Sequence, residues 1–286
     1  MTVSWLAGSN YHTTHCLGGT AVPTIYAVMH EVMNALCECP ELRNHAPTES
    51  QERIFDLADG TRFSLGGWLH QIRAPSSTEV PEVAAFYSGH YQKYGLNVQA
   101  ICDSRSRFTG YCFDSPGKVG DSIAFKKWKL RGVIMQLPAG FYIIGDNAYP
   151  LSNCLLVPFA KSEIRGKAYS DCNFYLSQQR IRIEMAFGLL IFKRPLEVDF
   201  MNVKKVIKTC MKLHNFCIDE RTKTQDARSS TREVAAEYHN LSESWYHPTD
   251  NTDAPDLLQP YAQGRILREV VINHIQNFNL RRPRTR

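Results

Sequence analysis

Apolar residues recur at helical spacing near the start of the chain. In residues 21–37 they stand three or four positions apart, which is typical of an amphipathic helix, at Ile25, Val28, Met29, Val32, Met33 and Leu36. A shorter helical segment, residues 9–16, precedes this helix across the Gly18-Gly19 pair. Two short helices around a glycine turn predict a helix-turn-helix-like segment over residues 1–45. A plain helical hairpin fits equally well, because the second helix carries almost no Lys or Arg.

Five short segments have the composition of β-strands. Residues 67–73, 96–102 and 108–113 are rich in β-branched and aromatic side chains. Residues 141–146 hold four consecutive apolar residues before an aspartate, as expected of a strand that is covered on both faces. Residues 155–159 are a fifth apolar run. Between the third and fourth segments, a Pro-Gly pair marks a loop that leads into a helix.

Helical periodicity returns in the second half of the chain. Residues 173–192, 202–220 and 264–278 predict three helices, and the polar, turn-rich residues 221–260 predict a flexible linker. Three antiparallel strands, a helix, a buried strand and further helices are the order of an α/β, ribonuclease-H-like mixed sheet flanked by helices. After the N-terminal segment we therefore predict a ribonuclease-H-like domain at residues 60–220. Residues 221–286 would be the linker, a helix and a basic tail.

Composition favours a protein inside the cell. The 286 residues are 43% hydrophobic, which is enough for one substantial core. No stretch approaches the roughly 18 to 20 apolar residues of a membrane span, and the first residues lack the pattern of a signal peptide. Nine cysteines without regular spacing favour free thiols in a reducing compartment. The net charge of +5 leans toward nucleic acid, but a surplus this small decides little.

Two acidic residues stand where a catalytic site is expected. Asp146 ends the apolar run of residues 141–146, and the sites of open α/β sheets gather at the carboxyl ends of strands. Glu184 lies beside an apolar stripe of a predicted helix. In the plainer alternative, Asp146 only begins an Asp-Asn turn, and Glu184 forms a surface ion pair with Arg180. A pair of carboxylates suits a hard divalent cation such as Mg²⁺.

Five blocks of sequence follow one another in an order that resembles a nuclease family. The blocks GHYQKYGLNVQAICDSRSRF, PGKVGDSIAF, GFYIIGDNAYP, LSQQRIRIEMAFGLL and MKLHNFCIDE are similar to the DDE endonuclease domain of PIF/Harbinger-type transposases. The resemblance implies a ribonuclease-H-like fold, Mg²⁺ or Mn²⁺ as cofactor, and phosphodiester cleavage and strand transfer on double-stranded DNA at transposon ends. It also implies that Asp146 is the second catalytic aspartate and Glu184 the catalytic glutamate. A nuclear location, a Myb-like helper protein and a homo-oligomer are further expectations from the family.

The chain departs from the family pattern at the first catalytic aspartate. The family strand carries an Asp-Gly pair, and an alignment on Ile72, Arg73, Pro75 and Ser76 puts Gly66 at the position of that aspartate. Because glycine has no side chain that could bind a cation, one metal ligand is missing. We expect this loss to lower the rate of catalysis by several orders of magnitude.

Asp103 is the candidate for a replacement acid. If the strand that ends at Ile72 pairs with the strand of residues 96–102, residues near 102 and 103 would lie beside Gly66 and Asp103 would join the catalytic and metal-binding residues. The plainer alternative is that Asp103 starts the following turn. Asp121 is a further candidate, although its place in the sequence fits a helix N-cap better. Two hypotheses follow: an impaired metal-dependent DNA endonuclease, or a catalytically inactive remnant that binds DNA or a protein partner.

Basic residues suggest where DNA would bind. They gather in a turn, before the fourth strand and on a late helix, where they could bind the phosphate backbone without reading sequence. The first two groups are the predicted DNA-binding residues: Arg105, Arg107, Lys126, Lys127 and Lys129. Solvated helix faces are the plainer explanation for the late helix. The C-terminal RRPRTR resembles a DNA-contacting tail or a nuclear import signal.

Overall fold

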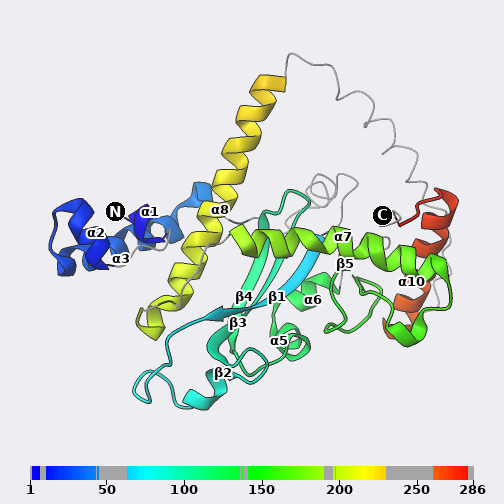
Figure 1. The fold of residues 1–286 in the computed structure, drawn as a ribbon, viewed down its shortest axis with the longest axis horizontal. Helices are drawn as coiled ribbons and strands as arrows, with labels where there is room; N and C mark the ends of the chain where they lie inside the picture. Colours follow the sequence, from blue (N-terminus) through cyan, green and yellow to red (C-terminus); the bar gives the residue numbers. More distant parts are fainter. Residues whose placement is uncertain are drawn as a thin grey trace.

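The computed structural model describes residues 2–6, 11–42, 44, 63–135, 137, 141–189, 196, 198–229 and 260–282. Figure 1 labels the helices and strands. In chain order they are α1 (Thr2–Leu6), α2 (Tyr11–Gly18), α3 (Val22–Glu38), η1 (Pro40–Leu42), β1 (Phe63–Gln71), η2 (Val83–Phe86), β2 (Tyr87–Ser88), β3 (Lys93–Cys102), β4 (Phe108–Pro116), α5 (Asp121–Lys127), α6 (Leu130–Ile134), β5 (Ile143–Ile144), β6 (Leu155–Leu156), η3 (Lys161–Glu163), α7 (Lys167–Leu189), α8 (Phe200–Ser229) and α10 (Pro260–Asn277).

A mixed sheet of six strands forms the centre of the described fold. The strands follow the order β2-β3-β1-β5-β6, and β4 also pairs with β3. β1 runs antiparallel to β3 and parallel to β5, and β5 runs parallel to β6. The predicted mixed α/β class is therefore confirmed, and the arrangement is consistent with a ribonuclease-H-like fold.

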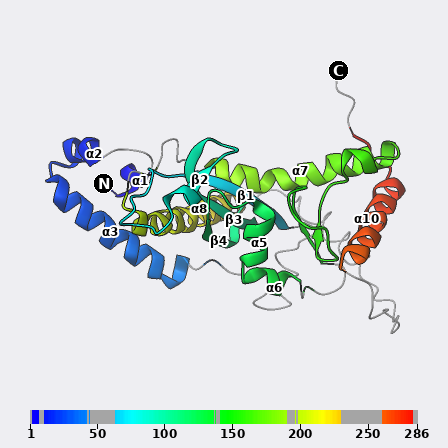
Figure 2. The same cartoon turned by 90° about the horizontal axis from the view of Figure 1, so that it is seen from below.

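The long helices α7 and α8 pack against the sheet (Figures 1 and 2). α7 packs on β1, and the Ser64 hydroxyl donates a hydrogen bond to the Gln179 carbonyl at 2.8 Å, which fixes this contact. α3 packs on α8, where Ile25, Met29 and Met33 are fully buried. The predicted amphipathic helix thus shares a hydrophobic cluster with residues of the sheet.

Several boundaries differ from those predicted. β1 begins at Phe63, four residues before the predicted strand, because pairing with β3 and β5 overrides the low β-propensity of Gly66 and Gly67. β5 comprises two residues of the predicted six. α8 continues to Ser229, so residues 221–229 are helical where a linker was expected, and residues 230–259 lie outside the described residues. None of the described helices combines the length and apolar composition needed to cross a membrane.

Candidate active site

Asp146 lies just past the carboxyl end of β5. The strand residues Ile143 and Ile144 are fully buried between β1 and β6. The backbone N–H of Ala148 donates to Asp146 Oδ1 at 2.8 Å, and the N–H of Tyr149 donates to the Asp146 carbonyl at 3.2 Å. The expected turn is therefore confirmed. It does not exclude a catalytic role, because the carboxylate remains partly exposed at the end of the strand.

The charged groups around Asp146 come from two other elements, α5 and α7. Burial raises the pKa of the Asp146 carboxyl, and the carboxylates of Asp121 and Glu184 raise it further, whereas the Ala148 N–H and the Arg180 guanidinium lower it. Asp146 and Glu184 are 38 positions apart in the sequence, but α7, which carries Glu184, packs on β5, which ends before Asp146. Like charges near a carboxylate disfavour its charged form, and a bound cation would offset that repulsion.

Glu184 stands on the partly exposed side of α7. Arg180 Nη1 lies 2.5 Å from Glu184 Oε1, so the expected ion pair one helical turn apart is confirmed. The Glu184 side chain is 52% exposed. An exposed pair of this kind contributes only about 0.3–0.5 kcal/mol to stability, so a stronger ligand could displace it. The adjacent residues Ile183 and Phe187 are buried against the sheet.

Gly66 faces α7. A Cβ atom added at Gly66 would lie 3.0 Å from Ile183 Cγ2, 3.2 Å from Ile183 Cγ1 and 3.5 Å from Phe187. The position that resembles the first catalytic aspartate is thus covered by apolar side chains of the same helix that carries Glu184. A carboxylate at this position would require the Ile183 side chain to move.

Asp103 takes part in a different cluster from Asp146. Gly66 pairs with Ala100, and Ser64 pairs with Cys102, so the prediction that residues 102 and 103 lie beside Gly66 is wrong by two to three positions. The Asp103 side chain is 2% exposed and bonds within its own turn. Its Oδ1 accepts the backbone N–H groups of Arg105 and Arg107 at 2.9 Å each, and its Oδ2 accepts Arg107 Nε at 2.7 Å.

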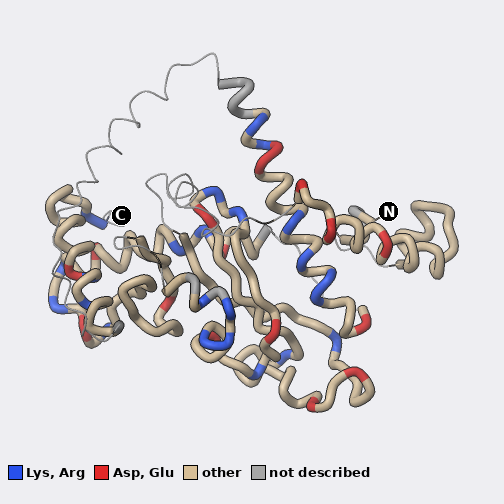
Figure 3. The backbone as a smooth tube through the Cα atoms, turned by 180° about the vertical axis from the view of Figure 1, so that it is seen from behind, with Lys and Arg blue, Asp and Glu red and all other residues tan. Residues whose placement is uncertain are grey.

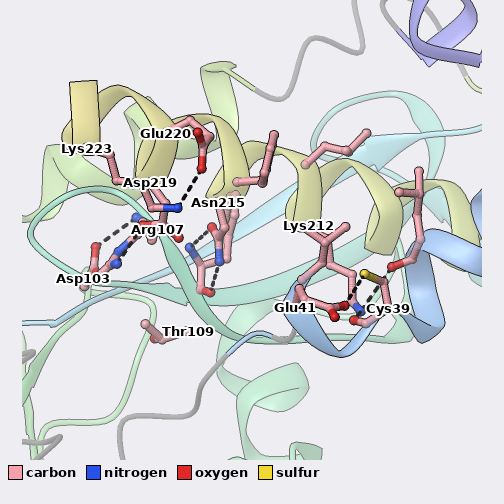
Figure 4. Close-up of a pocket in the computed structure, with 15 residues that line it drawn as sticks. Cys39, Glu41, Asp103, Arg107, Thr109, Lys212, Asn215, Asp219, Glu220 and Lys223 are labelled. Carbon is pink, nitrogen blue, oxygen red and sulfur yellow. Dashed lines mark hydrogen bonds and ion pairs between the residues drawn. The ribbon is translucent and has the colours of Figure 1, made fainter. Parts of the chain in front are cut away.

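Asp103 and Arg107 line a pocket of about 500 Å³ (Figure 4). The pocket lies between the end of α3, η1, the turn after β3, and α8. Arg107 Nη1 bonds Asp219 of α8 at 2.8 Å across it. Neither Asp146 nor Glu184 lines this pocket. The turn that holds Asp103 shares the pocket with α8, η1 and the end of α3 instead.

The polar residues of β3 are a part of this region that the sequence did not indicate. Asn97 and Gln99 point to one face of a strand that is otherwise apolar, and their amides donate to Asp121 Oδ1 at 2.8 Å each. Asp121 is the first residue of α5, whose N-cap is Gly120, so its carboxylate does not cap the helix as expected. The alternation of two amides within a buried strand was the signal that could have indicated this contact.

The acids present fit one cation better than two. Among the described residues, no three His, Cys, Asp or Glu side chains form a group that could hold a metal ion. Mg²⁺, however, is commonly bound through one or two carboxylates, with water and substrate phosphate completing its coordination. Asp146 and Glu184 fit that role. A pair of cations that share a first carboxylate does not fit, because Gly66 and Ile183 occupy that side.

The predicted DNA-binding residues differ in exposure and in the ion pairs that they form. Arg105, Lys126, Lys127 and Lys129 are exposed, the lysines at and just after the end of α5. Arg107 is held by two carboxylates. Figure 3 shows further basic residues along α8. Lys204 on this helix forms an ion pair with Asp114 at 2.7 Å, and this carboxylate offsets part of the positive charge of α8.

Comparison with protein families gives a match that spans the sheet, α7 and half of α8. Residues 65–215, more than half of the chain, match the model of the DDE superfamily endonuclease. Comparisons with curated proteins and with solved structures gave no match. The matched range contains Gly66, Asp146 and Glu184, together with the polar residues of β3 and Asp121. The chain therefore belongs to the DDE superfamily endonuclease family.

Proposed function

We propose that this protein is a Harbinger-type, transposase-derived endonuclease that acts on double-stranded DNA with a divalent cation and with impaired catalysis. The observation that carries the proposal is that α7, which carries Glu184, packs on β5, whose carboxyl end leads to Asp146. Family membership supports DNA as the substrate. Transposon ends, strand transfer, a Myb-like helper, a homo-oligomer and a nuclear location are parts of the proposal that rest on the resemblance in sequence.

Asp146 and Glu184 would hold Mg²⁺ or Mn²⁺ through their carboxylate oxygens. When bound, such an ion activates a nucleophilic oxygen and stabilises the leaving oxygen of a phosphodiester. The turn bonds of Asp146 hold its backbone in place, and the exposed side of Glu184 leaves room for a phosphate group. Gly66 supplies no ligand, and this is the reason that we expect slow cleavage.

A catalytically inactive, DNA-binding or protein-binding remnant is the second candidate. It is favoured by the packing of Ile183 against Gly66, because apolar side chains fill the place of the first acid. The Arg180–Glu184 ion pair also favours it, since it provides Glu184 with a partner in the absence of a cation. Asp103 as the replacement acid receives no support from the pairing of β1 with β3.

Cleavage of a labelled duplex in Mg²⁺ or Mn²⁺ separates the two candidates. The native chain should cut slowly, Glu184→Ala should not cut, and Gly66→Asp combined with Ile183→Ala should cut faster than the native chain. Asp103→Asn should leave any native cleavage unchanged if the protein remains folded. A native chain that binds the duplex, with neither it nor the double variant cutting, would establish the remnant.

A further inference from the structure

Two amide side chains are buried in the middle of β3. Asn97 is 7% exposed and Gln99 is 1% exposed, and the alternate residues Val98 and Ala100 are fully buried on the other face. Burial of an amide costs free energy unless its donors and acceptors are bonded. Gln99 Nε2 donates to Asn97 Oδ1 at 2.6 Å and to Asp121 Oδ1 at 2.8 Å. The two amides therefore bond each other and converge on one carboxylate oxygen.

Asp121 reaches these amides through a space that glycine leaves open. A Cβ atom added at Gly67 would lie 2.2 Å from Asp121 Oδ1 and 2.5 Å from Gln99 Nε2. Both distances are far shorter than a van der Waals contact. With any larger residue at position 67, the Asp121 carboxylate could not stay where it is. Gly66 and Gly67 therefore lie under different neighbours on the two faces of β1. Ile183 of α7 packs on Gly66, and the Asp121 carboxylate lies over Gly67.

Tyr149 connects this group to the turn that holds Asp146. Its hydroxyl donates to Gln99 Oε1 at 2.6 Å, and the side chain is buried with 4% exposed. Its ring packs edge-on against Phe125 of α5. The backbone N–H of the same residue closes the turn on the Asp146 carbonyl. A continuous hydrogen-bond chain therefore runs from Asp121 through Gln99 to Tyr149 and into the Asp146 turn.

We propose that Asp121, Gln99 and Tyr149 are positioning residues that fix the Asp146 turn for cation and phosphate binding. The role in cation and phosphate binding rests on the proposed function, whereas the hydrogen bonds themselves are seen in the structure. Because Gln99 and Tyr149 are buried and β3 is paired on both edges, the Tyr149 hydroxyl has a fixed acceptor. Loss of this bond should loosen the turn while leaving the sheet intact.

The test replaces one hydroxyl and follows the turn directly. Tyr149→Phe should raise the hydrogen-exchange rate of the Ala148 and Tyr149 amides by about three- to tenfold, the effect of losing one net hydrogen bond. Tyr175→Phe is the matched control, because its hydroxyl bonds the Arg281 carbonyl at an exposed site. Asp121→Ala should speed the same amides, and Asp121→Asn should restore most of the protection because its amide oxygen can still accept. Unchanged exchange at residues 148 and 149 in Tyr149→Phe would overturn the proposal.

Binding of Mn²⁺, followed by electron paramagnetic resonance, separates this inference from the proposed function. A native chain that binds Mn²⁺, with several-fold weaker binding in Tyr149→Phe and unchanged binding in Tyr175→Phe, supports both. If even the native chain binds no Mn²⁺, the proposed function fails, and faster exchange in Tyr149→Phe still supports the positioning of the turn. Equal Mn²⁺ affinity in the native chain and Tyr149→Phe would assign the hydrogen-bond chain to folding alone and overturn the positioning role.

Discussion

Ile183 of α7 packs against the backbone of Gly66 in β1, and a Cβ atom at Gly66 would lie 3.0 Å from Ile183 Cγ2. Ile183 is fully buried, and as a β-branched residue on a helix it has little freedom to rotate away. The absence of the first acid and the position of α7 are therefore linked. An aspartate at position 66 would therefore require the side chains of α7 to repack as well as supplying the missing carboxylate.

Gly66→Asp should lower the free energy of unfolding by about 1–3 kcal/mol, the usual cost of overpacking a core. Ile183→Ala should not restore full stability when it is added. In the Ile183→Ala background, however, Gly66→Asp should lower the free energy of unfolding by less than it does in the native chain. Urea unfolding of the four combinations measures this coupling. Gly89→Asp is the control, because nothing lies within 4 Å of a Cβ atom there. Equal costs in both backgrounds would contradict the predicted contact.

Gly67→Ala should destabilise the protein by more than about 1 kcal/mol, because the new methyl group and the Asp121 carboxylate cannot occupy the same space. Asp121→Gly should relieve much of this penalty in the double variant. Thermal unfolding gives the four values that are needed. Gly166→Ala, where a Cβ atom meets nothing within 4 Å, should change stability little. A Gly67→Ala protein as stable as Gly166→Ala would show that Asp121 is readily displaced.

Arg107 and Arg105 should separate into a structural and a DNA-binding residue. Arg107→Ala removes the side-chain partner of an Asp103 that is 2% exposed, and we expect a loss of about 2 kcal/mol in the free energy of unfolding. Arg105→Ala, in the same turn but exposed, should leave stability unchanged and weaken DNA binding. Chemical unfolding and fluorescence anisotropy with a labelled duplex measure the two effects. Equal stability of both variants would contradict the assignment.

The exposed lysines at α5 should bind phosphate without reading sequence. Replacing Lys126, Lys127 and Lys129 by alanine should weaken binding to any duplex and reduce the slope of log affinity against log salt by about 0.9 for each phosphate that is no longer neutralised. Anisotropy titrations at several salt concentrations give this slope. The exposed pair Lys161 and Lys167, replaced in the same way, is the control. An unchanged slope in the triple variant would place the DNA on another face.

Glu79 should make stability depend on pH in the acid range. The backbone N–H groups of Phe200 and Ser76 donate to its carboxylate, and with Arg73 beside it they lower its pKa from 4.5 to about 2. Because the folded-state pKa is lowered, the stabilisation is complete above about pH 4.5 and is lost as the pH falls toward about 2.

Glu79→Gln should therefore be less stable than the native chain at about pH 6, and the difference should shrink as the pH approaches about 2. Urea unfolding at several pH values measures the difference. Glu82→Gln, at an exposed site nearby, should show no such trend. A constant difference between the native chain and Glu79→Gln over this range would show that Glu79 acts without its charge.

Local sequence patterns determined the elements that carry the two retained acids. The apolar run before Asp146 predicted a buried strand, and β5 lies within it, since a strand covered on both faces needs apolar side chains on both. The helical periodicity around Glu184 predicted α7, and the ion pair with Arg180 followed from its spacing of four residues. Each of these features depends on residues that are close together in the sequence.

Which side chains face one another across the sheet depends on how distant segments pair and pack. The pairing of Gly66 with Ala100 separates Asp103 from Gly66, and a shift of two residues along the strand was beyond what composition could specify. The contact of Asp121 with Gln99 depends on where α5 docks on β3, and the cover over Gly66 depends on how α7 lies on β1. Such contacts join segments that are distant in the sequence, so strand register and helix packing determine them, and no local pattern encodes either.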